Sequence, residues 1–222
     1  MKITTRGTQE DTLLTLTWAP DNFHLSFSQG PKLFIVGADG SGLRQLPPMA
    51  GMNISNAVWS PDQKSVYVSA VEGALWYSHT IWKWSDGSNP EKIVEKCGFA
   101  YDIDPGGKYL LALIPFGEKT GVYEVPISER KCVPLLPGVA TGTIFALDGK
   151  SLLYAGAFRG EVGIYRQPWK DGTVIGTPQV ALKLPFTFPL NYGSTYDFSH
   201  DLSTIVYTRP GGHADLYLLS QK

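Results

Sequence analysis

The chain has 222 residues, a formal net charge of −1 at pH 7 and an aromatic content of 12%. No apolar run approaches 18 residues and no basic block is present, so we expect neither a membrane-spanning helix nor nucleic-acid binding. The 24 glycines and 16 prolines are typical of a chain with many turns.

A short phrase recurs five times along the chain. It reads WAPDNFHLSF, WSPDQKSVYV, IDPGGKYLLA, FALDGKSLLY and FSHDLSTIVY, starting at Trp18, Trp59, Ile103, Phe145 and Phe198. These starting residues lie 41, 44, 42 and 53 positions apart, and a period in this range is typical of a repeat architecture. Each phrase predicts an apolar residue that ends one strand, a tight turn built on Pro, Asp and Gly, and a second strand.

Further apolar segments follow each phrase. A second apolar run reads LFIV, IWKW, VYEV, IYRQPW and LYLL in the five repeats. In the first four repeats a short additional segment follows, with the sequences LRQL, EKIV, CVPLL and QVALKL. Four strands per repeat predict an all-β fold, namely a β-propeller of four-stranded antiparallel blades.

The Ser-Pro-Asp-Gly-Lys-like turn and the later Ile-Trp/Tyr…Asp-Gly phrase resemble the TolB-type, WD40-like propeller repeats, also called PD40. The resemblance covers nearly the whole chain, from Leu14 to Leu219. Three positions depart from the pattern, with Gly106 in place of Asp and with Leu147 and His200 in place of Pro. The apolar alternation is kept in these repeats, so we count all five.

We predict a single propeller domain over residues 1–222. Its repeats run approximately over 14–54, 55–98, 99–140, 141–193 and 194–222. The last repeat has no fourth strand of its own, and we expect the β-favouring residues 2–6 to complete it and close a ring of five blades. The alternatives are a frayed N-terminus and a partial ring of a larger propeller. A closed ring predicts a monomer, whereas open sheet edges predict self-association.

The resemblance implies an exported protein, of periplasmic or extracytoplasmic origin. The first residues, MKITTRGTQED, have no apolar core of the kind that marks a signal peptide. Two interpretations follow, a segment of a longer precursor or a cytoplasmic protein. Propellers of this type also occur beside kinase or winged-helix domains, so a fragment of a larger protein is a further interpretation.

The two cysteines are Cys97, which leaves the outer strand of the second repeat, and Cys132, which enters the outer strand of the third. Outer strands of adjacent blades are neighbours, so a disulfide is one interpretation, provided that the Cα atoms lie within about 7 Å. We favour the other interpretation, two small semi-buried thiols. The cysteines form no CxxC motif and no His stands at ligand spacing, which argues against a structural zinc.

The loops between blades, and those between the second and third strands of each blade, should converge on one face around the central channel. The between-blade loops cover residues 47–57, 95–101, 137–143 and 185–196, and the within-blade loops cover 71–80, 115–121, 156–163 and 209–215. The longest, 71–80 and 185–196, are rich in aromatic residues, and long loops in a regular repeat are where binding function is added. The candidates on this ligand face are Trp76, Tyr77, His79, Arg159, Tyr192, Tyr196, Arg209 and His213.

The residue before each starting apolar residue should face the channel. Those residues are Thr17, Val58, Asp102, Ile144 and Asp197. Two carboxylates in the same register would raise each other's pKa unless a cation joins them, and Ca²⁺ fits such oxygen ligands. The alternative is that each Asp accepts a hydrogen bond from a backbone N–H or pairs with a nearby Arg or Lys. We expect no other cofactor.

Catalytic motifs such as G-x-S-x-G and HExxH are absent. His24 and His200 lie in or beside the strand–turn phrase, which predicts structural roles. Asp102, Asp197 and Glu161 are the carboxylate trio that matches, by residue type alone, the triad of five-bladed propeller glycosidases. We therefore predict a non-enzymatic module that binds a protein or a small ligand. The alternatives are a hydrolase or lyase acting on a glycan or peptide with channel carboxylates, and a pure scaffold.

Overall fold

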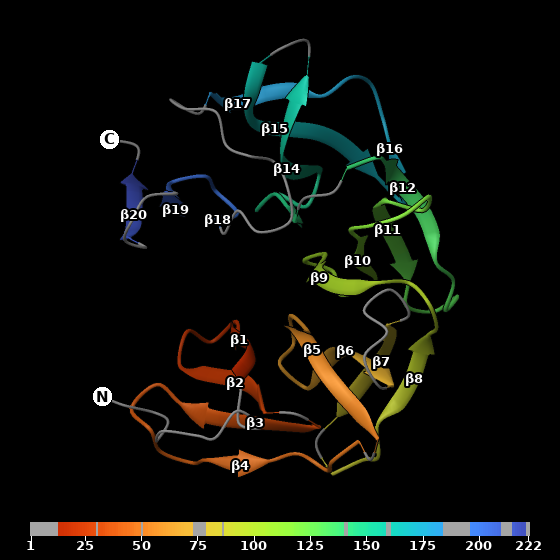
Figure 1. The fold of residues 1–222 in the computed structure, drawn as a ribbon, viewed down its shortest axis with the longest axis vertical. Helices are drawn as coiled ribbons and strands as arrows, with labels where there is room; N and C mark the ends of the chain where they lie inside the picture. The colour runs from red at the N-terminus through yellow and green to blue at the C-terminus, as the bar shows by residue number, and fades with distance from the viewer. Residues whose placement is uncertain are drawn as a thin grey trace.

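The computed structural model describes residues 13–29, 31–49, 51–72, 79–85, 87–139, 142–158, 161–183, 196–209 and 215–220. Five antiparallel sheets stand around a common centre, each with its first strand nearest to the middle (Figure 1). Among the described residues none belongs to a helix long and apolar enough to cross a membrane. The architecture is the predicted β-propeller.

The first three blades are four-stranded, and their strands run outward in chain order. The first blade contains β1 (Leu13–Trp18), β2 (His24–Gln29), β3 (Lys32–Gly37) and β4 (Arg44–Gln45). The second contains β5 (Met52–Trp59), β6 (Ser65–Glu72), β7 (Thr80–Ser85) and β8 (Glu91–Val94). The third contains β9 (Phe99–Ile103), β10 (Tyr109–Ile114), β11 (Gly121–Pro126) and β12 (Val133–Pro137).

The last two blades vary this plan. The fourth contains β13 (Thr143–Phe145), β14 (Ser151–Phe158), β15 (Glu161–Lys170) and β17 (Gln179–Lys183), with β16 (Thr173–Val174) paired to the end of β15. In the described residues the fifth contains β18 (Tyr196–Phe198), β19 (Thr204–Arg209) and β20 (Asp215–Ser220). Residues 2–6, which we expected to complete this blade, lie outside the described residues.

The starting apolar residue of each repeat occupies the same place in its blade. Across the first hairpin of each blade the starting residue lies opposite an apolar residue of the second strand, in the pairs Trp18–Leu25, Trp59–Val66, Ile103–Leu110, Phe145–Leu152 and Phe198–Ile205. In the second to fifth blades this residue is buried in a cluster shared with the preceding blade. Trp18 of the first blade is 55% exposed. The core of the molecule is therefore a series of inter-blade layers.

The turn of the phrase has one backbone shape in all five repeats. Its fourth residue after the starting residue has a positive φ, at Asn22, Gln63, Gly107, Gly149 and Leu202. In four turns the preceding Asp accepts a hydrogen bond from the backbone N–H two positions further on, at Asp21, Asp62, Asp148 and Asp201. Asp and Gly recur in the phrase because this turn requires an acceptor and a left-handed residue.

The third repeat replaces this Asp by Gly106 but has an acceptor two positions earlier, at Asp104. Asp104 accepts hydrogen bonds at 2.6 Å from the N–H groups of Lys108 and Tyr109, and at 2.9 Å from that of Gly106. The carboxylate has moved within the turn, and its role is preserved. This explains why the departure from the repeat pattern leaves the fold intact.

The cysteines correct one expectation. Cys97 and Cys132 form a disulfide, with their Cα atoms 5.6 Å apart. The interpretation as two thiols was therefore wrong. The two cysteines lie close together because the turn before β12 is held against β8. In this turn Arg130 pairs with Glu91 and donates a hydrogen bond to the carbonyl oxygen of Lys92. The second and third blades are thus joined covalently at the outside of the ring.

Candidate functional site

Most of the candidates on the ligand face cannot be placed. Trp76, Tyr77, Arg159, Tyr192 and His213 lie outside the described residues. Of the other three candidates, His79 is described below, whereas Tyr196 lies opposite Tyr207 at the start of β18 and Arg209 lies opposite Asp215 at the end of β19. Their predicted role in binding stays a prediction.

His79 lies inside the protein and not on the rim. Its side chain is 0% exposed, and its ring centroid lies 4.1 Å from that of Phe99 at the start of β9. Its carbonyl accepts a hydrogen bond from the N–H of Cys97. His79 therefore packs the second blade against the third, and our expectation of an exposed, ligand-facing imidazole does not hold.

A hollow of about 220 Å³ opens beside this contact, between the second and third blades. We call it the rim hollow, and it is lined by Ser55 and Asn56 of β5, Phe99 and Tyr101 of β9, and Leu113 of β10. Tyr101 is 42% exposed, whereas Phe99 and Leu113 are buried. The hollow thus combines an accessible aromatic ring, an apolar floor and a polar wall.

Two β-bulges direct residues toward the rim hollow. The pairing of β5 with β6 skips Ser55, and that of β9 with β10 skips Tyr101. β1 has a shift between Leu13 and Leu16, which matches the place of the shift in β5 when counted from the starting apolar residue, whereas the shift in β9 lies two residues closer to that residue. A bulged residue leaves the alternation of the strand, and bulges are frequent beside functional sites because they redirect a side chain.

Hydrogen bonds hold the polar wall of the rim hollow in place. Ser55 Oγ donates to the carbonyl of Ser69 at 3.0 Å, and Asn56 Nδ2 donates to that of Ala100 at 2.5 Å. The second bond crosses from the second blade to the third. A Cβ atom at Gly142 would lie 2.5 Å from Tyr101 Cε1, so the glycine makes room for the tyrosine ring.

Asp102, one of the two predicted channel carboxylates, ties two blades together. Its side chain is 13% exposed, and Oδ2 accepts a hydrogen bond from the backbone N–H of Phe145 in the fourth blade at 2.7 Å. This is the backbone-capping role that we named as the alternative to a metal ligand. Asp197 pairs with Val206 in the fifth blade. The predicted Ca²⁺ site between the two carboxylates stays a prediction.

His200 contacts the same residue of the fourth blade through the next peptide group. Its Nδ1 lies 2.6 Å from the carbonyl oxygen of Phe145 and donates to it, because a carbonyl oxygen only accepts. The same nitrogen lies 3.9 Å from Asp102 Oδ2. His200 therefore has the structural role predicted for it, and side chains of the third and fifth blades both bond to the backbone of Phe145 in the fourth.

The environment of Asp102 changes its acidity. Burial disfavours the charged carboxylate and raises the pKa of Asp102 to about 6, while the nearby His200 and the N–H of Phe145 oppose this shift. In the described residues there is no group of three or more His, Cys, Asp or Glu side chains able to hold a metal ion. Glu161 begins β15 opposite Phe158, and its predicted place in a catalytic trio is untested.

The rim hollow was only partly visible in the sequence. Ser55, Asn56, Phe99 and Tyr101 all lie in the between-blade loops 47–57 and 95–101, which we assigned to the ligand face. We placed the candidates on the longest loops, however, because length was the available signal. The aromatic pair Phe99 and Tyr101 beside a predicted inner strand could have drawn attention to the shorter loop.

Comparison with known proteins gives similarity at the level of structure. No protein-family model matches the chain, and no curated protein matches its sequence. TolB from Acinetobacter baumannii superposes with a TM-score of 0.65 at 19% identity, over 91% of this chain and 51% of that one. The chain thus spans about half the length of that TolB.

Two further solved structures define the range of the similarity. A putative TolB from Agrobacterium tumefaciens superposes with a TM-score of 0.66 at 14% identity, over 95% of this chain and 77% of that one. An oligogalacturonate lyase in complex with manganese gives a TM-score of 0.55 at 12% identity, over 67% of this chain and 46% of that one. Together with the antiparallel blades, these similarities establish a TolB-type β-propeller fold.

Proposed function

We propose that this chain is a non-enzymatic, TolB-like propeller module that binds a protein or a small ligand on its loop face. One observation carries the proposal, namely that bulges in two adjacent inner strands bring Ser55 and Tyr101 to a single hollow at that face. Bulges in neighbouring repeats thus contribute to one concave, partly aromatic surface.

The chemistry of the rim hollow favours one inserted side chain of a partner. Its volume of about 220 Å³ is smaller than the roughly 300–1,000 Å³ of pockets for whole drug-sized ligands. Tyr101 offers a ring for apolar or cationic groups, and Ser55 and Asn56 form a polar wall of fixed orientation. Partners with an apolar or aromatic anchor residue match this combination.

Peptide display against the folded protein tests the proposal. We expect selected peptides to lose at least tenfold in affinity for Tyr101→Ser, because this change removes the ring but leaves the bulge. Leu147→Ser is the matched control, since Leu147 is 72% exposed in a turn at the opposite ends of the inner strands. Peptides that bind both variants equally well, measured by calorimetry, would place the site elsewhere on the surface.

A thermal-shift panel extends the test to small ligands. A ligand at a hundred times its Kd adds about 2.7 kcal/mol to the free energy of unfolding. For a domain of this size that corresponds to a rise in Tm of about 5–10 °C. Peptides or sugars that raise the Tm of the parent but not of Tyr101→Ser support the proposal, whereas a response that is equal in the two proteins contradicts it.

A glycan-acting lyase or hydrolase is the second candidate function, and Asp102 favours it. Its pKa of about 6 is in the range of a carboxyl group that can donate a proton near neutral pH. An assay with oligogalacturonides and other acidic glycans tests this candidate. Cleavage by the parent that is lost in Asp102→Asn supports it, and no cleavage by either protein rules out this substrate class.

The disulfide supports an extracytoplasmic location, which we propose together with the binding role. Disulfides persist in oxidising compartments and are rare in reducing ones. Cys97 and Cys132 are both in the bond, and the chain has 2 cysteines. Thiol labelling of the protein as isolated from its native cells is expected to find no free thiol, and quantitative labelling would contradict the location.

A further inference from the structure

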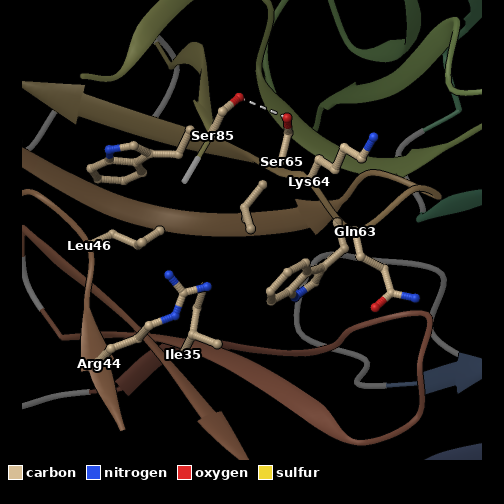
Figure 2. A pocket seen from close by; sticks show the side chains of 10 residues that line it. Ile35, Arg44, Leu46, Gln63, Lys64, Ser65 and Ser85 are labelled. Carbon is tan, nitrogen blue, oxygen red and sulfur yellow. Dashed lines mark hydrogen bonds between the residues drawn. The ribbon is translucent and has the colours of Figure 1, made fainter. Parts of the chain in front are cut away.

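We propose that a second hollow, between the first and second blades, binds a small aromatic compound that carries a hydrogen-bond acceptor. The hollow has a volume of about 430 Å³ and lies at the end of β5 remote from the rim hollow. We call it the turn-face pocket, because Gln63 and Lys64 of the turn after β5 line it (Figure 2). Its size falls in the range of about 300–1,000 Å³ that is typical of small-molecule sites.

The walls of the turn-face pocket are aromatic and aliphatic. Trp59 and Trp84 come from the second blade, and Ile35 and Leu46 come from the first. All four side chains are buried members of one inter-blade cluster. Flat indole rings opposite branched aliphatic side chains favour a planar apolar ligand, because such a ring covers much apolar surface without needing polar partners of its own.

Trp84 identifies the polar group that the ligand must carry. The side chain is 1% exposed, and its Nε1 is buried without a hydrogen-bond partner among the described residues. In contrast, Nε1 of Trp59 donates to Ser26 Oγ and that of Trp169 donates to Glu124 Oε2, both at 2.9 Å. A buried donor without an acceptor is unfavourable, so a ligand whose oxygen displaces the side chains that cover Trp84 Nε1 gains the bond that the protein lacks.

The rim of the pocket is polar. Figure 2 shows the guanidinium of Arg44 turned toward the interior from β4, with Gln63 and Lys64 on the opposite side. The hydroxyl groups of Ser65 and Ser85 lie 2.9 Å apart and are hydrogen-bonded to each other. A planar guanidinium stacks on aromatic rings whether or not it is paired elsewhere, so Arg44 adds to the preference for a ring.

Gln63 occupies the left-handed position of its turn and extends its side chain to the edge of the turn-face pocket. Its φ of 63° is in the left-handed region, where two of the equivalent turns have Gly107 and Gly149. Leu202, at the same position of the fifth repeat, has a buried side chain in the core, which explains its retention. Gln63 is exposed and has no such packing role, and its side chain lines the pocket.

The groove between the third and fourth blades is equivalent to the turn-face pocket, and it shows which kind of group the chain places there. Phe145, which corresponds to Trp59 in register, lies against the indole of Trp169, with their ring centroids 5.1 Å apart. Tyr109 contacts the same indole from the third blade, with ring centroids 5.3 Å apart. The chain thus fills this groove with the indole ring of Trp169, whose Nε1 is hydrogen-bonded to Glu124. The matching position in the second blade, residue 86, lies outside the described residues.

Indole N–H resonances measure binding at this site directly, because the protein has 6 tryptophans. The ¹⁵N-labelled protein is titrated with p-cresol, whose ring and hydroxyl represent the proposed class, and with cyclohexanol, which has the hydroxyl but no aromatic ring. We expect saturable shifts of the Trp84 and Trp59 indole signals with p-cresol and at least a fivefold weaker response to cyclohexanol. Signals that move together without saturation would overturn the proposal.

Variants separate the pocket from general surface binding. Trp84→Phe removes the N–H and keeps a ring, so p-cresol affinity is expected to fall at least fivefold while toluene affinity is unchanged. Gln63→Gly removes a rim side chain in a backbone that suits glycine, and we expect at least a threefold loss. Lys150→Ala, at the place of Lys64 in the fourth blade, is the matched control and is expected to bind as the parent does.

Each outcome of these titrations either supports or contradicts binding of a small aromatic compound in the turn-face pocket. Should Trp84→Phe fail to fold, the Gln63→Gly and Lys150→Ala comparison carries the test alone, and equal affinities there contradict the proposal. N-acetyl-tyrosinamide represents an aromatic side chain of a partner chain. If it binds at Trp84 while p-cresol does not, the pocket is a peptide site and the small-compound proposal is wrong.

Discussion

Asp102 accepts a hydrogen bond from the backbone N–H of Phe145 at 2.7 Å, across the junction of the third and fourth blades. The carboxylate is buried, and its pKa is raised from 3.8 to about 6, chiefly by desolvation. A raised folded-state pKa stabilises the protein below pH 4 relative to neutral pH, and this contribution is lost as the pH rises through 6. His200 and Asp104 also act on this carboxyl group.

Asp102→Asn is therefore expected to remove this pH dependence. A shift of this size corresponds to about 1–3 kcal/mol, so the stability of the variant relative to the parent should increase by that amount between pH 4 and pH 8. Urea unfolding at both pH values measures it. Asp171→Asn, which removes an exposed turn carboxylate, controls for the loss of one negative charge. A constant difference between variant and parent would contradict the assignment.

The turn carboxylate Asp201 should behave in the opposite way. Hydrogen bonds from Ser199 Oγ and from the backbone N–H of Ser203 lower its pKa to about 2. Its stabilising contribution is present above pH 4 and is lost as the pH falls toward 2. We expect Asp201→Ala to lower the Tm by about 2–4 °C at pH 7 and to match the parent near pH 2. Asp201→Asn, which keeps an acceptor, should lose less.

Glycine substitutions at two equivalent turn positions should have opposite effects. Gln63→Gly relieves a left-handed backbone at an exposed site, and we expect a gain in the free energy of unfolding of about 0.5–1 kcal/mol. Leu202→Gly relieves the same strain but removes a buried core side chain, so a loss of about 2–4 kcal/mol is expected. Chemical denaturation measures both. Two changes of the same sign would argue against the common turn geometry.

The disulfide makes a further prediction. Cys97 and Cys132 are separated by 35 positions, and closing a loop of this length in the unfolded chain stabilises the native state by about 3–4 kcal/mol. Reduction, or the double variant Cys97→Ser with Cys132→Ser, is expected to lower the midpoint of urea unfolding accordingly. The parent without reductant serves as the reference, and an unchanged midpoint on verified reduction would contradict the bond's structural role.

Closure of the ring is tested by removing residues 1–7. We predict that residues 2–6 complete the fifth blade, so the shortened chain should expose sheet edges and self-associate. Light scattering after size-exclusion chromatography compares its mass with that of the full chain. A shortened chain that stays monomeric and equally stable would show that another segment closes the ring.

The repeat architecture was predictable because its signals are local. The pairing of Trp59 with Val66, and of Phe145 with Leu152, follows from an apolar residue at a fixed distance from a turn that needs Asp and a left-handed residue. These requirements depend on neighbours in the chain. They are therefore visible in one sequence, and they persist even where Asp104 takes over the role of the usual Asp.

The features that sequence reasoning missed depend on distances between blades. The disulfide needed the outer strands to approach, which spacing along the chain does not reveal. The bulges at Ser55 and Tyr101 interrupt the alternation by one residue and have no distinctive composition. His79 was assigned to the rim because it ends a long loop, yet its ring lies against Phe99 of the next blade. Only the assembled ring brings these residues together.

The bond between Cys97 and Cys132 also determines how the ring responds to a pulling force. When the two ends of the chain are drawn apart, the 35-residue separation between the cysteines is bypassed by the covalent link. About 120 Å of contour length is then hidden from a stretching instrument, at roughly 3.5 Å per residue. Adding a reductant under load would break the bond and release this length in one step. The extension of the chain would therefore report whether the bond between the two blades is oxidised or reduced.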